Sequence, residues 1–561
     1  MRMRRMLLLA LMALLALPAA ALAGEEDVKV QLLGLNDFHG HLESNTPGTI
    51  APDPTQPRVP AGGAEYLATH LRQKESTNSN TLIVSAGDLI GASPLLSALF
   101  HDEPTIEAMN QMGLDLNAVG NHEFDEGAAE LLRMQRGGCH PVDGCQDGTG
   151  FRGARFDFLA ANVVDENRGR TIFPPYAIKR FDGIKVGFIG MTLEGTPDIV
   201  SPSGVAGLDF LDEAETANRY ADELRRRHDV RAIVVLLHEG GVQTQPGGIN
   251  DCNAISGPIV DIVNRTTRQV DLFVTGHTHS AYNCVIDRRP VTSASSFGRL
   301  LTDIDLTLDS GSRDVVEVVA NNQIVTQNVF KDPAITDLIA RYNEIAAPLR
   351  DRPIGRISAD ISRTPDDSGE NAAGNLIADA QLAATSSPET GGAVAAFMNP
   401  GGVRSDFLFA QSGSEGDGVV TYGEAFTVQP FGNSLVTMTL SGAQILQMLQ
   451  QQWCGQQSPR ILLPSATVSY TWSRSAVANA CTTNPVSDLT IGGAPVDPGA
   501  SYRITVNSFL ADGGDGFSVL REGTDRLGGA VDTDALEAYI APSLEGEPIA
   551  PPALDRIDVT P

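Results

Sequence analysis

Five short apolar runs, each followed directly by polar residues, constrain the fold of this chain more than any other feature. The runs cover residues 28–35, 82–86, 116–119, 232–237 and 270–275. Short apolar runs bounded by glycine are typical of buried strands in a parallel sheet. Because ligand sites in such sheets lie beyond the carboxyl ends of the strands, the residues that follow the runs should meet at one edge.

The segments that follow these runs contain aspartate, histidine and asparagine. The candidate residues are Asp37, His39, Asp88, Asn121, His122, Asp125, His238, His277 and His279. Carboxylate, amide and imidazole groups suit divalent metal ions, and Zn, Mn, Fe and Co are equally compatible with them. Two metals about 4 Å apart can share one carboxylate, and Asp88 is the natural candidate for that bridge.

Taken singly, most of these motifs have an ordinary structural explanation. Asp37 and Asp88 fit turns after strands, a lone His238 fits a structural histidine, and Asp125 fits a surface acid. Their occurrence together, each at the end of a predicted strand, favours a metal centre over these explanations.

Length and charge limit the class of protein. A chain of 561 residues is long for one domain and predicts two or more. The formal net charge of −29 argues against binding a nucleic acid polymer or an anionic membrane. A small phosphorylated substrate is still compatible, because bound dications and a few arginines can make one cleft locally positive. The oligomeric state is left open.

Residues 1–23 have the pattern of a signal peptide. Arg2, Arg4 and Arg5 precede an apolar run at residues 6–17, and Ala21 and Ala23 provide small residues at a cleavage site. An uncleaved membrane anchor is the alternative, but the apolar run is short for a membrane span. We therefore expect export to the periplasm or the medium, with no membrane span after cleavage.

Six cysteines fit an oxidising compartment. Many pairings are possible, and proximity along the chain favours Cys139–Cys145, Cys252–Cys284 and Cys454–Cys481. A thiolate zinc site is the alternative, although no Cys-x-x-Cys spacing is present. A bridge between Cys252 and Cys284 would stiffen the segment around His277.

The rest of the pattern is of mixed helix and strand. Amphipathic helices are expected at residues 64–75, 105–113 and 213–228, between the strands of the first half. Residues 332–349 read as one amphipathic helix that connects two domains near a hinge. The second half predicts helices at residues 372–384 and 441–452 and strands at residues 393–398 and 502–506.

The combined motifs resemble a known enzyme family. The set Asp37-x-His39, Gly87-Asp88, Gly120-Asn121-His122-Glu123, His238 and Gly276-His277-x-His279 is similar to that of the calcineurin-like metallophosphoesterases. The second half resembles the 5′-nucleotidase branch of that family through Gly374-Asn375, Asn399-x-Gly401-Gly402-Val403-Arg404, Pro430-Phe431-Gly432-Asn433 and Gly513-Gly514-Asp515-Gly516-Phe517.

This resemblance implies an α/β protein of two domains. A four-layer α/β/β/α metallophosphoesterase domain would occupy residues 24–330, followed by a linker helix at residues 331–352. An α/β nucleotide-binding domain would occupy residues 353–561.

The resemblance also assigns expected roles to residues. One divalent metal would be held by Asp37, His39, Asp88 and His279, and a second by Asp88, Asn121, His238 and His277. His122 would be the catalytic histidine, oriented by Asp125. The substrate would contact Asn399, Gly401, Gly402 and Arg404, and the aromatic pair Phe431 and Phe517. Some relatives carry an arginine just before the Gly374-Asn375 segment, and the family has an acidic residue after the second phenylalanine. Arg363 and Glu522 are the candidates for these two roles in this chain.

The implied function is that of an exported 5′-nucleotidase. Such an enzyme releases phosphate from nucleoside 5′-monophosphates by in-line attack of a metal-bound hydroxide. The alternatives within the same chemistry are a UDP-sugar or dinucleotide pyrophosphatase, a 2′,3′-cyclic nucleotide phosphodiesterase and, more distantly, a sulfur-ester hydrolase. A nucleotide-binding surface protein without catalysis is the alternative from another class.

Overall fold

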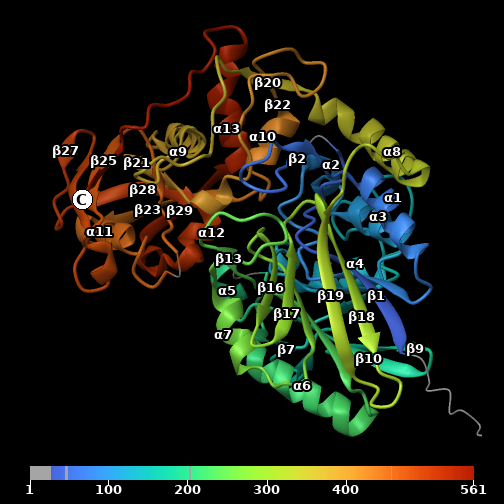
Figure 1. Cartoon of the computed structure of the whole chain (residues 1–561). Helices are drawn as coiled ribbons and strands as arrows, with labels where there is room; N and C mark the ends of the chain where they lie inside the picture. The colour runs from blue at the N-terminus through green and yellow to red at the C-terminus, as the bar shows by residue number, and fades with distance from the viewer. Residues whose placement is uncertain (1–26, 45–47, 201–203, 457) are drawn as a thin grey trace, which may run out of the picture.

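The computed structural model describes residues 27–44, 48–200, 204–456 and 458–561. The expected signal peptide at residues 1–23 lies outside the described residues. Figure 1 shows an N-terminal domain, blue to yellow, and a C-terminal domain, orange to red, with helix α8 (Pro333–Arg350) between them along the chain. Within the described ranges, no helix has both the length and the apolar composition needed to cross a bilayer.

The first sheet of the N-terminal domain has six strands. Their order is β19 (Val315–Ile324), β18 (Leu300–Leu308), β1 (Val28–Leu35), β4 (Thr81–Ser85), β5 (Leu116–Ala118) and β6 (Asp157–Leu159). Strands β1, β4, β5 and β6 run parallel, whereas β18 and β19 are antiparallel additions. Three of the five predicted runs therefore end at the same edge of this sheet.

The second sheet also has six strands. Their order is β16 (Ala281–Ile286), β17 (Arg289–Ala294), β15 (Leu272–Thr275), β12 (Ala232–His238), β10 (Ile184–Thr192) and β9 (Tyr176–Phe181). The other two predicted runs are β12 and β15, which lie side by side and parallel.

The two sheets pack face to face, with helices on both outer faces. Val30 and Val84 of the first sheet belong to one buried core with Phe188 and Val234 of the second. Helices α1 (Ala64–Glu75), α3 (Glu103–Met112) and α4 (Ala128–Arg136) cover the first sheet, and α6 (Glu213–His228) and α7 (Pro258–Arg265) cover the second. The predicted four-layer α/β/β/α fold is confirmed.

Helix α8 belongs to the packing of the N-terminal domain. The Asp332 side chain caps it by accepting hydrogen bonds from the backbone N–H groups of Ala334 and Ile335. Its apolar face buries Leu338 and Tyr342 in the core beneath α1 and α3, while Ile345 is 41% exposed. The helix also contacts α10 (Tyr422–Val428) of the C-terminal domain.

The C-terminal domain contains a five-stranded and a four-stranded sheet, besides the two-stranded pair of β20 (Pro353–Arg356) and β22 (Val419–Thr421). One has the order β24 (Leu463–Pro464), β21 (Ala395–Met398), β28 (Ser501–Asn507), β23 (Ser434–Ser441) and β29 (Thr524–Val531). The other has the order β27 (Ala494–Pro495), β26 (Val486–Ile491), β25 (Val468–Ser473) and β30 (Ile557–Thr560). Helices α9 (Ala372–Thr385), α11 (Gly442–Gln450), α12 (Ser508–Ala511) and α13 (Asp532–Ile540) complete the domain.

Short elements occupy the connections. They are β2 (Thr49–Ile50), β3 (Val59–Pro60), β7 (Val163–Asp165), β8 (Arg170–Thr171), β11 (Leu208–Phe210), β13 (Val242–Gln243), β14 (Ile255–Ser256), β20 (Pro353–Arg356), β22 (Val419–Thr421), α2 (Leu95–Ala98) and α5 (Thr196–Ile199). Of these, α5 contacts the turn at Gly514–Gly516, so a helix of the N-terminal domain reaches the C-terminal domain.

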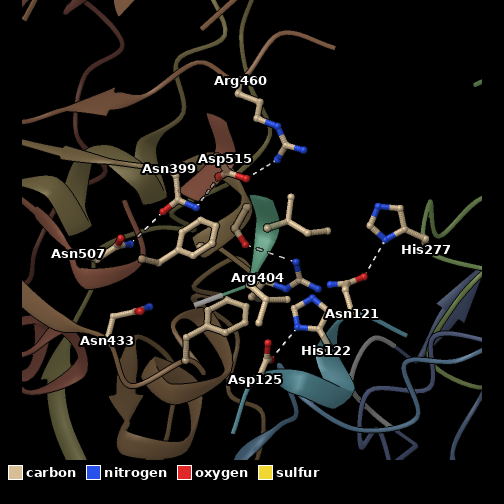
Figure 2. A pocket seen from close by; sticks show the side chains of 16 residues that line it. Asn121, His122, Asp125, His277, Asn399, Arg404, Asn433, Arg460, Asn507 and Asp515 are labelled. Atoms are coloured by element: carbon tan, nitrogen blue, oxygen red, sulfur yellow. Dashed lines mark hydrogen bonds and ion pairs between the residues drawn. The ribbon is translucent and has the colours of Figure 1, made fainter. Parts of the chain in front are cut away.

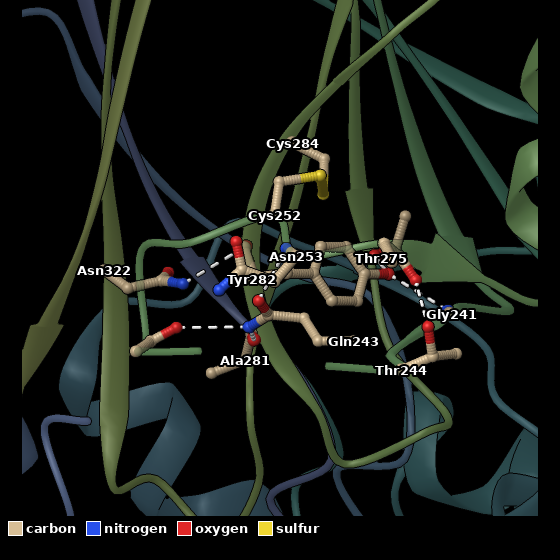
Figure 3. The surroundings of a disulfide bond; sticks show 12 residues. Gly241, Gln243, Thr244, Cys252, Asn253, Thr275, Ala281, Tyr282, Cys284 and Asn322 are labelled. Atoms are coloured by element: carbon tan, nitrogen blue, oxygen red, sulfur yellow. Dashed lines mark hydrogen bonds between the residues drawn. A yellow bond between two sulfur atoms is a disulfide. The ribbon is translucent and has the colours of Figure 1, made fainter. Parts of the chain in front are cut away.

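The cysteines pair as expected: Cys139–Cys145, Cys252–Cys284 and Cys454–Cys481. Figure 3 shows that the Cys252–Cys284 bridge joins a loop to β16 beside Tyr282. The Tyr282 hydroxyl lies 2.6 Å from the hydroxyl of Thr275, the last residue of β15. The bridge therefore supports the strand that leads into His277.

Candidate active site

The carboxyl ends of five strands bring the predicted ligands together. Asp37 and His39 follow β1, Asp88 follows β4, and Asn121 follows β5 in the first sheet. From the second sheet, His238 ends β12, and His277 and His279 follow β15. Three groups have candidate ligand atoms within 4.8 Å of one another: Asp37, His39 and His279; His39, Asp88 and His122; and Asp88, His238 and His277.

Asp88 lies between the two halves of this cluster. Its Oδ2 atom is 2.9 Å from His238 Nε2 and 3.6 Å from His39 Nε2. On one side, His279 Nε2 is 3.2 Å from Asp37 Oδ1. On the other, His277 Nδ1 lies 3.0 Å from Asn121 Oδ1. The position of Asp88 is the one expected of a bridging carboxylate.

The histidine tautomers fit metal binding. His39 Nδ1 is 2.8 Å from the carbonyl oxygen of Gly91, and His238 Nδ1 is 2.7 Å from that of Ala86. A carbonyl oxygen only accepts, so each Nδ1 carries a proton and each Nε2 can present a lone pair to the cluster. His39 Nε2 and His279 Nε2 are 3.1 Å apart, which is unfavourable for two lone pairs unless a cation lies near both.

The environment of His238 also favours a cation. Its buried Nε2 atom lies 2.9 Å from Asp88 Oδ2 and has no other polar partner among the described residues. Burial lowers the pKa of His238, but the Asp88 carboxylate outweighs burial and raises this pKa to about 10. The pair therefore attracts a positive charge, and a divalent metal can supply it.

Five of the predicted ligands have left-handed backbone conformations. The φ angles are 50° for Asp37, 47° for His39, 52° for Asp88, 71° for His277 and 53° for His279. Positive φ is uncommon outside glycine and persists where the surrounding structure holds it in place. The surrounding structure therefore holds these residues in an uncommon backbone conformation that directs their side chains toward the cluster.

Glu123 holds two of the ligand loops in position. Its carboxylate accepts hydrogen bonds from the backbone N–H groups of Asp88 at 2.9 Å, Leu89 at 3.0 Å and Gly120 at 2.6 Å. Burial, followed by the charge of Asp88, raises the pKa of Glu123 to about 7. The sequence motif contained Glu123, but its positioning role depends on this three-dimensional contact.

His122 and Asp125 form the expected pair. His122 Nδ1 lies 2.7 Å from Asp125 Oδ2, and the His122 backbone N–H donates to Asp88 Oδ1 at 2.9 Å. Although burial lowers it, the charges of Asp125 and Asp88 raise the pKa of His122 overall. The ring of His122 also stacks on Phe431, with centroids 5.7 Å apart and planes at 19°.

One cavity leads from this centre into the C-terminal domain (Figure 2). It has a volume of about 260 Å³. The N-terminal domain contributes Asn121, His122, Asp125, Ile199, Val200 and His277, and the C-terminal domain contributes Asn399, Gly401, Gly402, Arg404, Phe431, Asn433, Arg460, Asn507, Phe509 and Asp515. The cavity is therefore a joint product of the two domains.

Comparison with known proteins agrees with this arrangement. Residues 30–281 match the calcineurin-like phosphoesterase family, and residues 353–522 match the 5′-nucleotidase C-terminal domain. The chain is 32% identical over 550 residues to the cell wall protein Lmo0130 of Listeria monocytogenes, covering 93% of this chain and 67% of that protein. The chain belongs to the 5′-nucleotidase family of calcineurin-like phosphoesterases. The matches support a phosphohydrolase, and the family implies divalent metal ions, for which the clustered aspartates and histidines are candidate ligands.

Two further comparisons describe the extent of the likeness. The chain is 31% identical over 495 residues to the endonuclease YhcR of Bacillus subtilis, of which it spans only 37%. The crystal structure of a 5′-nucleotidase precursor from Thermus thermophilus has a TM-score of 0.74 and 26% identity, covering 95% of this chain and 99% of that one. The two-domain architecture is therefore that of the 5′-nucleotidase family.

Five of the predicted substrate contacts line this cavity: Asn399, Gly401, Gly402, Arg404 and Phe431. Arg404 makes no ion pair with a described residue and donates only a long hydrogen bond, 3.4 Å, to the carbonyl oxygen of Gly401. Burial and the nearby Arg363 lower the pKa of Arg404. Its guanidinium is thus free to bind an anion.

The prediction for Phe517 is wrong about its position. Phe517 is fully buried in the core of the C-terminal domain and does not line the cavity, whereas Phe509 does. The turn through Gly513, Asp515 and Gly516, which have positive φ, directs the chain inward after the pocket. Phe509 packs over Gly514, where a Cβ atom would come within 2.5 Å of the ring. The sequence feature that could have identified Phe509 as a pocket residue is its position just after strand β28.

Glu522 and Arg363 also lie outside this cavity. Glu522 is exposed and accepts a hydrogen bond from Gln444 at 3.1 Å. The acidic position in the pocket belongs to Asp515, which accepts from Asn399 at 2.9 Å and from Arg460 at 2.5 Å. The sequence motif Gly513-Gly514-Asp515-Gly516-Phe517 contained Asp515 but did not indicate this role, because Asn399 and Arg460 are distant from it along the chain.

Proposed function

We propose that this phosphohydrolase is an exported 5′-nucleotidase that releases phosphate from nucleoside 5′-monophosphates. The observation that supports this most is the single cavity that joins His122 and Asn121 to Phe431 and Phe509. A substrate that spans it must carry an aromatic group at one end and a phosphate at the other. Nucleoside monophosphates have this form.

The cavity, hereafter the nucleotide pocket, offers a partner for each part of a nucleotide. Phe431 and Phe509 would stack on the base, which contributes roughly 1–3 kcal/mol per base and tolerates different bases. Asp515, oriented by Asn399, would accept hydrogen bonds from ribose hydroxyls. Arg404 would bind phosphate oxygens.

The phosphate would react at the strand ends. Two divalent metals, held by Asp37, His39, Asp88 and His279 and by Asp88, Asn121, His238 and His277, would supply an activated water and neutralise phosphate charge. The Nδ1–H of His122 donates to the Asp125 carboxylate, so the Nε2 atom is available for the leaving oxygen. As an imidazolium, it would donate a proton to that oxygen as the phosphorus–oxygen bond breaks.

Export is part of the same proposal. Residues 1–23 have the composition of a signal peptide, and three disulfides suit an oxidising compartment. The periplasm or the medium would also give the enzyme access to external nucleotides. Fractionation of producing cells should recover a protein that lacks these residues.

The test is phosphate release from the metal-loaded mature protein. We expect hydrolysis of AMP, GMP and UMP that EDTA abolishes and that His122→Ala lowers by about 10²–10⁴-fold. The control is His70→Ala, because the hydrogen bonds of the His70 imidazole are to Thr326, away from the cluster. UDP-glucose, 2′,3′-cyclic AMP and bis(p-nitrophenyl) phosphate serve as competing substrates. Preference for one of these would move the assignment to a diesterase or pyrophosphatase, and no turnover with any metal would refute catalysis.

A further inference from the structure

A separate group of histidines and carboxylates lies in the N-terminal domain, outside the cluster at the strand ends. Potential ligand atoms of His101, Glu126 and His140 all lie within 4.8 Å of one another. Asp143 joins them, because its Oδ2 atom is 2.9 Å from His101 Nε2 and 3.3 Å from His140 Nδ1. The proposed reaction uses none of these side chains, so their arrangement needs an explanation of its own.

The group is assembled from three separate segments of the chain. His101 lies between α2 and α3, Glu126 lies just before α4, and the other two residues lie in the loop that the Cys139–Cys145 bridge closes. The φ angle of His101 is 51°, an uncommon backbone conformation that the surrounding structure holds in place. Holding such distant segments together costs conformational entropy, and a ligand that binds only the assembled group offsets this cost.

The two imidazole rings of the group are stacked on each other. The ring centroids of His101 and His140 are 3.7 Å apart, and the planes are at 17°. Their side chains are only 17% and 15% exposed, whereas the side chains of Glu126 and Asp143 are each 46% exposed. The imidazoles are therefore held in place, while the carboxylates have room to close around an ion.

The group has more negative than positive charge. His101 Nδ1 lies 2.7 Å from Glu126 Oε2, and carboxylate oxygens only accept, so both ring nitrogens of His101 carry protons when no metal is bound. In the described ranges, neither Glu126 nor Asp143 forms an ion pair with a lysine or an arginine. Glu130, a further acid nearby, is paired with Arg133 at 2.6 Å. One imidazolium thus faces two carboxylates, and a divalent cation would balance their charge.

The second histidine presents a lone pair to the group. The backbone N–H of Asp143 donates to His140 Nδ1 at 3.1 Å, so this nitrogen carries no proton. The same nitrogen is 3.3 Å from Asp143 Oδ2, and two acceptor atoms at this distance repel each other unless a cation lies near both. Ligand atoms around a tetrahedral zinc ion are about 3.3 Å apart, given bonds of about 2.0–2.1 Å. The spacing of this pair is therefore the one that zinc requires.

We propose that this group, hereafter the loop metal site, binds a further divalent metal ion through His101, Glu126, His140 and Asp143. Imidazole and carboxylate ligands in a four-coordinate arrangement suit zinc. The ion takes the place of a proton on His101, which is released to solvent. It joins the disulfide-closed loop to the segment that follows the catalytic pair. The site does not depend on which substrate the enzyme hydrolyses.

Zinc analysis of the mature protein tests the loop metal site. After loading with Zn²⁺ and dialysis, we expect His140→Gln to retain about one zinc equivalent less than the wild type, because a ligand nitrogen is lost. His228→Gln is the matched control, because the His228 imidazole contacts the Tyr176 hydroxyl at 3.0 Å, at the end of α6. Melting temperatures measured in EDTA report whether each variant is folded.

A milder variant and a second background locate the ion. Asp143→Asn keeps both imidazoles and should weaken zinc binding at least about tenfold in a calorimetric titration. In an Asp88→Asn protein, which lacks the carboxylate shared at the strand ends, zinc that remains bound should be lost when His140→Gln is added. Equal zinc content in folded wild type, His140→Gln and Asp143→Asn would overturn the proposal. So would an Asp88→Asn protein whose zinc content does not change when His140→Gln is added.

Discussion

At the residue scale, two phenylalanines close in sequence have opposite surroundings. Phe509 lines the cavity between the domains, whereas Phe517 is fully buried in the C-terminal core. Only the direction of the turn between them decides which ring meets a ligand. Their substitution to alanine therefore separates binding from stability.

We expect Phe509→Ala to raise KM for AMP, with a loss of about 1–3 kcal/mol in binding and little change in melting temperature. Phe517→Ala should instead lower the free energy of unfolding by about 3–5 kcal/mol, because it leaves a cavity in the core. Steady-state kinetics and urea denaturation of both variants measure the two effects. A larger effect of Phe517→Ala on KM than on stability would reverse the assignment.

His101 is expected to make stability depend on pH. Its Nδ1 lies 2.7 Å from Glu126 Oε2 and its Nε2 lies 2.9 Å from Asp143 Oδ2. The hydrogen bond to Glu126 is the largest cause that raises the pKa of His101 to about 9. Because this pKa is above that of an unfolded histidine, about 6.5, the stabilisation is complete below pH 6.5. It disappears as the pH rises through about 9.

The variant His101→Gln should therefore lower the free energy of unfolding at pH 6 and have a much smaller effect at pH 10. Urea denaturation of the metal-free protein at the two pH values measures the difference. The variant His70→Gln controls for the loss of an imidazole that bonds a backbone carbonyl instead. Equal destabilisation by His101→Gln at both pH values would disprove this role.

At the element scale, the strand ends and their supports determine the geometry of the site. Glu123 joins the loops after β4 and β5 through backbone hydrogen bonds. In the second sheet, Tyr282 of β16 contacts Thr275 at the end of β15, beside the Cys252–Cys284 bridge (Figure 3). The loop after β4 and the end of β15 are thus held by side chains from neighbouring elements.

Replacing Cys252 and Cys284 together by serine should lower the free energy of unfolding by about 2–4 kcal/mol, since the bridge restricts the unfolded chain. We also expect weaker metal retention, because the support near His277 is lost. Calorimetry and metal analysis of the variant check both effects. The Cys454–Cys481 pair is the control, since it closes a loop of similar length in the C-terminal domain, away from β15. Equal metal loss in both double variants would argue against a local effect.

At the scale of the whole molecule, the predicted metal centre connects the two sheets. Asp37, Asp88 and Asn121 follow strands of the first sheet, while His238 and His277 come from the second. We therefore expect metal bound at this centre to stabilise the association of the sheets as well as the site. In the same way, the nucleotide pocket depends on the association of the two domains, because both domains line it.

Removal of metal with EDTA should abolish activity and lower the melting temperature, because a ligand that binds only the folded state stabilises it by mass action. Adding Mn²⁺ or Zn²⁺ should restore both properties. Differential scanning calorimetry and phosphate release, measured in parallel, check the expectation. EDTA saturated with calcium before addition is the control. An unchanged melting temperature together with full metal removal would show that the centre does not link the sheets.

The sequence by itself determined the strands, the residues at their ends and the family. Short apolar runs and the polar residues next to them are local features, so Asp37, Asp88 and His277 could be assigned to one edge before their contacts were known. The cysteine pairs were also predictable, because each pair is close along the chain.

Only the tertiary structure decided which side chains meet the substrate pocket. Phe509 and Asp515 line this pocket, whereas Phe517 and Glu522 do not. Arg363 lines a second cavity, and Arg404 lines both. The physical reason is that turn direction and domain contact place these side chains, and both depend on residues far apart in sequence. Hydrophobic periodicity specifies which elements form, whereas a cavity between domains depends on how the completed elements pack.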